Sequence, residues 1–351
     1  MPTVWPPDAA IAQKSQLWHF MRSLGITDFD TFHAKSIDDP AAFLALALTF
    51  FRIKLEAPVD HVSLITGGIN DSTWLQGGRL NAARLITENA PPSQIAITWE
   101  NDLGESRSWS YRAFSSIAKR AAGALLAAGA GPGCRILSPP ALSLEKIALL
   151  AAAARIGATV VSSSPTHIVT MDQWESFLAL QATHEVVSVA PDHPFYDWRT
   201  HGAFLIKAAL DLALTANVTR GTRFAWFGQD PAMLLGALTL GATVILFDDG
   251  GIPTTDRLWA LCAHQNVEVL GITPNAASRL PPSAADRHNL DSLQTIVIDG
   301  VLDDATFGSL HFKTKVLPTP VLQYQNGILS DNLLLEVEPG RPAHCCPLSL
   351  Q

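Results

Sequence analysis

The sequence predicts an α/β protein in which a helical N-terminal segment is followed by two packed α/β lobes with mostly parallel sheets. Apolar residues recur at helical spacing over the first 60 residues, and from residue 95 short β-branched runs alternate with longer helical patterns. A chain of 351 residues, 48% of them hydrophobic, can fill the cores that such lobes require. We therefore divide the chain into a helical N-terminal cap region (residues 1–88), a first α/β lobe (89–200) and a second α/β lobe (201–351).

The cap region is predicted to contain two or three amphipathic helices. Leu17, Phe20 and Met21 share one helical face, and apolar residues return at the same spacing between residues 43 and 51. Residues 61–80 carry several glycines and are predicted to form a glycine-rich connection to the first lobe.

The first lobe begins with a predicted β-hairpin, whose strands are residues 95–99 and 107–109 and whose turn is residues 101–104. After it, helices and strands alternate, as a mostly parallel sheet with crossover helices requires. The other elements predicted here are helices 111–128 and 142–155 and strands 135–137, 158–161 and 185–189.

The second lobe repeats this alternation without an internal sequence repeat of fixed period. Its short β-branched runs are separated by longer apolar helical patterns, which again predicts parallel strands joined by helices. The predicted elements are helices 202–214, 232–240 and 257–264 and strands 223–227, 242–247, 267–271 and 295–298.

Composition and charge exclude several kinds of partner. A net charge of −8 gives no basic stripe for phosphate contacts, so we expect no nucleic-acid partner. The longest apolar run, residues 147–161, is interrupted by Arg155 and Gly157 and falls short of the roughly 20 residues that span a bilayer. Four cysteines without a CxxC pair and an N-terminus without a signal pattern predict a reduced, cytoplasmic protein with no membrane partner.

Several ordered motifs carry a family resemblance. Residues 74–85 (WLQGGRLNAARL) resemble the segment that leads into the body of acetyl- and acetoacetyl-CoA synthetases, and residues 156–165 (IGATVVSSSP) resemble their IGAI.SS.SP stretch. In the second half, residues 201–207 resemble HGG.L..H.K and residues 240–250 resemble GAT.VLYDGSP. The chain thus resembles an acetoacetyl-CoA synthetase-like member of the adenylate-forming, or AMP-binding, superfamily. The resemblance implies the fold of the large N-terminal domain of these enzymes and an acid–CoA ligase that uses ATP and Mg²⁺.

The resemblance breaks where the family binds ATP phosphates. Residues 192–195 resemble the HP.F approach to a Ser/Thr/Gly-rich loop with a lysine, a loop that points N–H groups and hydroxyls at a triphosphate. Here only residues 196–200 precede His201; they contain no glycine and no lysine, and Asp197 would repel phosphate.

The later nucleotide motifs are also altered. Residues 298–302 stand where the family has STGSPL, and residues 323–327 replace SGGTD without its threonine. The sequence ends at Gln351, before the hinge and the C-terminal lid domain that the family would place next. We therefore expect a truncated pseudoenzyme that does not adenylate and has neither ATP nor Mg²⁺ as a cofactor. Enzymatic activity of another kind stays open, and no catalytic residue is assigned.

A ligand cleft is predicted at the carboxyl ends of the second-lobe strands, where such folds bind ligands. In the family, the loop after the strand at Trp226 helps to wall the acyl pocket, and its shortening here would admit a larger ligand. The alternative is a collapsed cleft filled by Tyr196, Trp198 and Trp226. The histidines are scattered and no metal site is expected. The predicted ligand-binding residues are Trp226, Gln229, Asp230, Thr273, Asn275, Asp299 and Gln325.

Two classes of function follow. The first is an enzyme-like role in small-molecule, acyl or secondary metabolism, as a binder of acyl-CoA-type or polyketide-like ligands or as a catalyst of an ATP-independent biosynthetic step. The second is a non-catalytic protein partner or regulator of a full-length synthetase, with a homodimer or a degenerate gene product as further alternatives.

Overall fold

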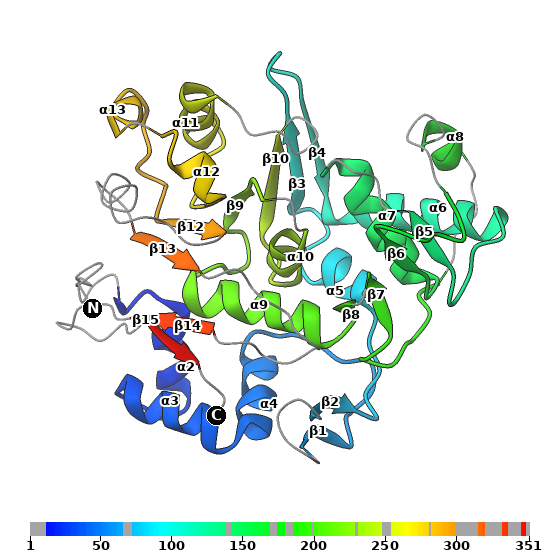
Figure 1. Cartoon of the computed structure of the whole chain (residues 1–351), viewed down its shortest axis with the longest axis horizontal. Coiled ribbons are helices and arrows are strands. Elements are labelled where there is room, and N and C mark those ends of the chain that lie inside the picture. Colours follow the sequence, from blue (N-terminus) through cyan, green and yellow to red (C-terminus); the bar gives the residue numbers. More distant parts are fainter. Residues whose placement is uncertain are drawn as a thin grey trace.

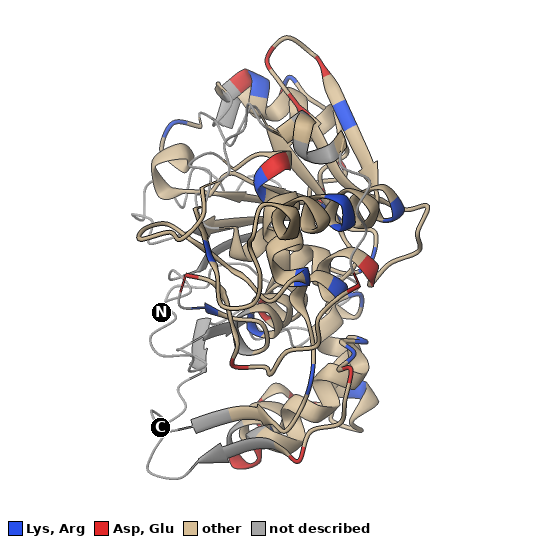
Figure 2. Ribbon diagram, turned by 90° about the vertical axis from the view of Figure 1, so that its right-hand side faces the viewer, with Lys and Arg blue, Asp and Glu red and all other residues tan. Residues whose placement is uncertain are grey.

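The structure is a computed structural model, and it contains one helical region and two principal sheets (Figure 1). Figure 2 shows the same ribbon from the side, with charged residues of both signs scattered over it. Within the described residues, none of the helices combines the length and the apolar character needed to cross a bilayer. The described residues are 12–65, 72–137, 142–168, 174–179, 185–197, 199–228, 231–247, 254–280, 282–299, 315–319, 332–335 and 345–348.

The predicted amphipathic helices near the N-terminus are present. Each of these helices begins at a polar side chain that accepts a backbone N–H of the first turn, as N-caps do. The helices pack around Phe20, which is fully buried and contacts the rings of Phe32, Phe43 and Phe50 at 5.0–5.7 Å between centroids. The helices are α2 (Gln16–Ser23), α3 (Phe29–Asp38) and α4 (Pro40–Phe50), with N-caps Ser15, Asp28 and Asp39.

The glycine-rich connection contains regular structure that the sequence analysis missed. Strands β1 (His61–Ile65) and β2 (Ser72–Gln76) pair antiparallel. Helix α5 (Ala82–Glu88) follows and packs against the first lobe. Its N-cap Asn81 is buried and donates to Ala154 O and Val187 O at 2.7 Å, so the amide ties this connection to the body.

The main sheet, in the part of the chain that the structure describes, has seven strands in the order β13-β12-β11-β9-β10-β3-β4. All neighbours are parallel except the predicted β3–β4 hairpin, which confirms the mostly parallel α/β class. The hairpin was assigned to the first lobe, yet β3 pairs with β10 of the second. The lobe boundary therefore does not separate the sheets. The strands are β3 (Ile95–Glu100), β4 (Ser106–Ser110), β9 (Arg223–Trp226), β10 (Thr243–Phe247), β11 (Val269–Ile272), β12 (Thr295–Asp299) and β13 (Lys315–Thr319).

Helices cover both faces of the main sheet. Alternate residues of β9 face opposite ways: Phe224 and Trp226 join the larger core, whereas Ala225 and Phe227 join a second core with Trp259 of α11. This alternation is the period-2 pattern of a strand buried on both faces. The covering helices are α9 (Ala203–Thr215) and α10 (Ala232–Thr239) on the first face and α11 (Thr255–His264), α12 (Pro274–Ala277) and α13 (Pro282–Ala285) on the second.

The second sheet has the order β5-β6-β7-β8. The predicted strand 185–189 is wrong: the segment contributes only a bridge between Val189 and Leu80, and Val187 N donates to Arg155 O. The sheet continues through residues 194–200 instead. Its elements and neighbours are β5 (Arg135–Leu137), β6 (Thr159–Val161), β7 (Pro194–Tyr196), β8 (Arg199–Thr200), α6 (Tyr111–Ala127), α7 (Leu144–Arg155) and α8 (Trp174–Ala179); β14 (Asn332–Leu335) and β15 (Cys345–Leu348) form a separate pair.

Candidate functional site

Three of the predicted ligand-binding positions lie at the carboxyl edge of adjacent strands of the main sheet. Trp226 ends β9 and pairs with Gly271 of β11, Thr273 follows the end of β11, and Asp299 ends β12. Thr273 Oγ1 accepts Ala276 N at 3.3 Å and so caps α12, in whose first turn Asn275 is exposed. The structure describes the backbone of Asp299, whereas Gln229, Asp230 and Gln325 lie outside the described residues.

The Trp226 indole is a packed part of this edge. It is 4% exposed and stacks on Phe224 with 6.1 Å between ring centroids. A Cβ at Gly271 would lie 1.9 Å from Cε3 of Trp226, and a Cβ at Gly228 would lie 2.6 Å from its Cε2. The indole therefore occupies the space that side chains would take at two glycines, where close approach explains the residue type.

The alternative of a collapsed cleft requires Tyr196, Trp198 and Trp226 to lie together, and the structure does not place Tyr196 beside Trp226 in one sheet. Tyr196 belongs to the second sheet, where its ring lies under the Arg199 guanidinium at 5.3 Å and the Lys146 ammonium at 6.0 Å. Trp198 lies outside the described residues. Of the three aromatic residues named for that filling, the structure places only Trp226 at the carboxyl edge of the main sheet.

A tight hairpin occupies the place where the resemblance puts the phosphate-binding loop. Strands β7 and β8 pair antiparallel around Asp197, whose φ of 51° is left-handed. The Asp197 carboxylate accepts Ser162 N at 2.7 Å and Ser162 Oγ at 2.8 Å. Its backbone N–H donates to Val160 O at 2.7 Å. The turn thus presents a fixed carboxylate, and the N–H of its central residue is already used.

His201, at the start of α9, is buried without exposure and acts as an anchor. Its Nδ1 accepts the N–H of Ala82 at 3.0 Å, which joins the starts of α9 and α5. Burial, with a smaller contribution from His193, lowers the pKa of His201 to about 3. The imidazole is therefore neutral with its proton on Nε2.

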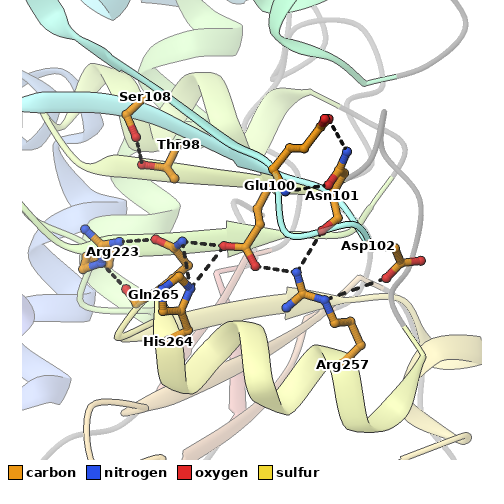
Figure 3. A network of polar contacts seen from close by, with 10 residues as sticks. Thr98, Glu100, Asn101, Asp102, Ser108, Arg223, Arg257, His264 and Gln265 are labelled. Carbon is orange, nitrogen blue, oxygen red and sulfur yellow. Dashed lines mark hydrogen bonds and ion pairs between the residues drawn. The ribbon is translucent and has the colours of Figure 1, made fainter.

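A network of polar contacts centred on Glu100 escaped the sequence analysis (Figure 3). Glu100 is 4% exposed; one carboxylate oxygen accepts Arg257 Nη2, and the other accepts Gln265 Nε2 at 2.7 Å and lies 3.2 Å from His264 Nδ1. Burial alone would raise the pKa of Glu100, but the Arg257 and Gln265 donors outweigh it and lower that pKa. An ionised, paired carboxylate fixes α11 against the end of β3 and is unsuited to donate a proton.

Nothing in the described residues suggests a metal centre. No group of three His, Cys, Asp or Glu side chains in that part of the chain is arranged to hold a metal ion. The described residues at the carboxyl edge of the main sheet, Trp226, Thr273 and Asn275, offer apolar contact and hydrogen bonding.

The fold matches the large N-terminal domain fold of acyl-CoA synthetases, as the motifs predict. The structure resembles an acetoacetyl-CoA synthetase from Streptomyces lividans with a TM-score of 0.81, at 16% identity over 98% of this chain and 68% of that one. The N-terminal domain of FACL13 from Mycobacterium tuberculosis matches with a TM-score of 0.61, at 17% identity over 73% of this chain and 79% of that one.

Sequence relatives name the same class. The chain is 36% identical over 89 residues (24% of its length) to the 3-hydroxypropionyl-coenzyme A synthetase of Metallosphaera sedula. It is 26% identical over 170 residues (46% of its length) to the acetoacetyl-coenzyme A synthetase of Rhizobium meliloti. These matches span 14% and 26% of the two relatives. No family profile matches the chain.

Proposed function

We propose that this acetoacetyl-CoA synthetase-like protein binds an acyl or CoA-type ligand without adenylating it, in an ATP-independent step of small-molecule or secondary metabolism. The β7–β8 hairpin is the observation that supports this most directly. Its turn carries the Asp197 carboxylate, held by Ser162, at the position that the resemblance assigns to a loop of phosphate donors. A carboxylate about 4 Å from one phosphate charge is repelled by about 4 kcal/mol near a protein surface.

The ligand is proposed to bind at the carboxyl edge of the main sheet. Trp226 supplies an apolar wall, and the Asn275 amide is exposed and has no hydrogen-bond partner among the described residues. Thr273 Oγ1 already accepts one N–H and retains a hydroxyl proton to donate. An apolar wall with a few polar groups is typical of small-molecule sites. Asp299, Gln229, Asp230 and Gln325 remain proposed members of the site.

Calorimetric titration tests both parts of the proposal. We expect binding of acetoacetyl-CoA and no binding of ATP–Mg²⁺. Asn275→Ala should weaken acetoacetyl-CoA binding several-fold, because it removes a hydrogen-bonding group worth about 1 kcal/mol. The matched control is Ser278→Ala, an exposed position at the other end of α12.

Two outcomes would redirect the proposal. Tight ATP–Mg²⁺ binding would contradict the loss of the nucleotide site. Silence toward both ligands would favour the second candidate, a non-catalytic partner of a full-length synthetase.

A further inference from the structure

A second cleft lies between the cap region and the second lobe, away from the carboxyl edge of the main sheet. It has a volume of about 330 Å³ and is built where α4 ends, where α10 ends, where the chain leaves α9, and where α2 begins. Its lining mixes apolar side chains with polar and charged ones, so it offers both apolar contact and hydrogen-bond donors to a ligand. It is lined by Gln16, Phe50, Phe51, Arg52, Val218, Thr219, Arg220 and Leu240.

Among the described residues that line this cleft, the charged ones are two arginines, although the whole chain carries a net charge of −8. Arg220 Nη2 donates to Asn89 O at 3.2 Å and has donors to spare. Within the described part of the chain, the Arg52 guanidinium, the Gln16 side-chain amide and the Thr219 hydroxyl have no hydrogen-bond or ion-pair partner. These polar groups are thus available to a ligand.

Arg52 occupies a backbone position that does not favour arginine. Its φ is 59°, and Ile53 N donates to Leu48 O at 2.9 Å, which is the left-handed end of a Schellman-type helix terminus. The same kind of helix end occurs at Gly241 (φ 79°) and Asn266 (φ 48°), which are the residue types that tolerate it. An arginine kept at such a position is consistent with a role for its side chain.

A neighbouring cleft of about 180 Å³ provides the contrast. It also contains cations, but Arg84 Nε lies 2.8 Å from Glu56 and Arg84 Nη1 lies 3.6 Å from Glu88. Carboxylates of the protein therefore already compensate Arg84 there, whereas none of the described residues that line the cleft at Arg52 carries a carboxylate.

We propose that the cleft at Arg52 and Arg220 binds a small organic monocarboxylate. The planar guanidinium forks match a carboxylate, and Phe50, Phe51 and Leu240 would surround the apolar body of the ligand. A single charge fits better than a phosphate dianion, because three helix C-termini with negative dipole ends lie at the cleft and only one positive end, the start of α2, offsets them. This site is separate from the ligand edge of the proposed function and does not depend on it.

The test uses 2-naphthoate as the probe and neutral 2-naphthamide as its isosteric control, titrated by calorimetry into the full chain. We expect naphthoate to bind and naphthamide to bind at least tenfold more weakly. Arg52→Gly and Arg220→Gln should each weaken naphthoate binding about tenfold, the loss of a charged hydrogen bond. Arg52→Gly also relieves the left-handed backbone, so its melting temperature should equal or exceed that of the wild type.

The matched charge control is Lys54→Ala in the smaller cleft, which should leave naphthoate binding unchanged. Saturation with acetoacetyl-CoA should leave it unchanged as well, which separates this site from the carboxyl edge. The proposal is overturned if naphthamide binds equally well, if Arg52→Gly binds naphthoate as the wild type does, or if acetoacetyl-CoA displaces the probe.

Discussion

The two sheets of the molecule end in different ways. At the carboxyl edge of the main sheet, the buried Trp226 indole packs against Gly228 and Gly271. The short helix α12 lies beside it and presents the exposed Asn275 amide. The second sheet ends in a tight turn that holds a carboxylate, in the region that the family resemblance assigns to a phosphate-binding loop. One edge thus combines an apolar side chain with an exposed amide, whereas the other presents a negative charge. The comparison shows that the residues that build a fold and the residues that carry its chemistry have to be assessed separately.

At the carboxyl edge of the main sheet, the largest loss of stability is expected from a substitution of Gly271. Gly271→Ala should lower the free energy of unfolding by about 3 kcal/mol, because the added Cβ would lie 1.9 Å from the Trp226 ring and a packed core cannot absorb it. Urea denaturation monitored by tryptophan fluorescence measures this. Gly131→Ala is the matched control: a Cβ there meets nothing within 4 Å, so an unchanged midpoint is expected. Equal effects at both positions would refute the close packing of the Trp226 indole on Gly271.

The Glu100 network supports the other face of the main sheet. Glu100→Gln should cost about 2 kcal/mol of unfolding free energy, since it removes the buried charged partner of Arg257 and leaves only the more distant, exposed Asp102 at 3.8 Å among the described residues. Glu105→Gln, on an exposed turn of the same hairpin, should cost less than about 0.5 kcal/mol. Chemical denaturation at pH 7 compares the two, and a Glu100→Gln variant as stable as the control would show that the network does not anchor α11.

We expect the unfolding free energy to depend on pH through His201, which lies between the two sheets. Its folded-state pKa of about 3 lies below the ordinary 6.5, so the unfolded chain takes up a proton first as the pH falls. The stability that this group contributes is complete above pH 6.5 and declines below it, by up to about 1.4 kcal/mol per pH unit. His201→Asn should flatten the decline of the unfolding free energy between pH 7 and pH 5. A variant with the wild-type slope would assign the decline to other groups.

The role of the carboxylate in the β7–β8 turn is tested by Asp197→Asn. Asparagine tolerates the left-handed φ of 51°, so the substitution tests the charge and not the backbone. We expect a loss of about 1 kcal/mol in unfolding free energy, from two weakened hydrogen bonds to Ser162. Ser162→Ala removes one of these bonds and should cost less. If Asp197→Asn is more stable than the wild type, the carboxylate is not fixed by Ser162.

Local patterns predicted much of the fold. The β3–β4 hairpin, the cap helices and the parallel alternation follow from periodicity, which depends on neighbours in the chain. The prediction of a strand at residues 185–189 was wrong. Its β-branched residues favour a strand locally, but in the described structure the segment pairs only through the bridge between Val189 and Leu80. The Glu100 network was missed because Glu100 and Arg257 are 157 positions apart and match no motif.

The candidate site was predicted in part for the same reason. Strand ends could be read from the sequence, and Trp226 and Thr273 do lie at one edge. The packing of the Trp226 indole on Gly271 could not be predicted, because it depends on the register of β9 against β11 that places the two residues side by side. Tyr196 was assigned to the wrong sheet edge because side-chain type alone does not say which strands are neighbours.

Pyrophosphate exchange into ATP, measured on the full chain with Mg²⁺ and acetoacetate, decides whether this chain adenylates an acid. We expect no exchange above background for the wild type, and none for Asp197→Asn, because removing one charge does not supply phosphate-binding donors. Acetoacetate-dependent exchange by the wild-type chain would show that it adenylates its substrate and would refute the proposed function.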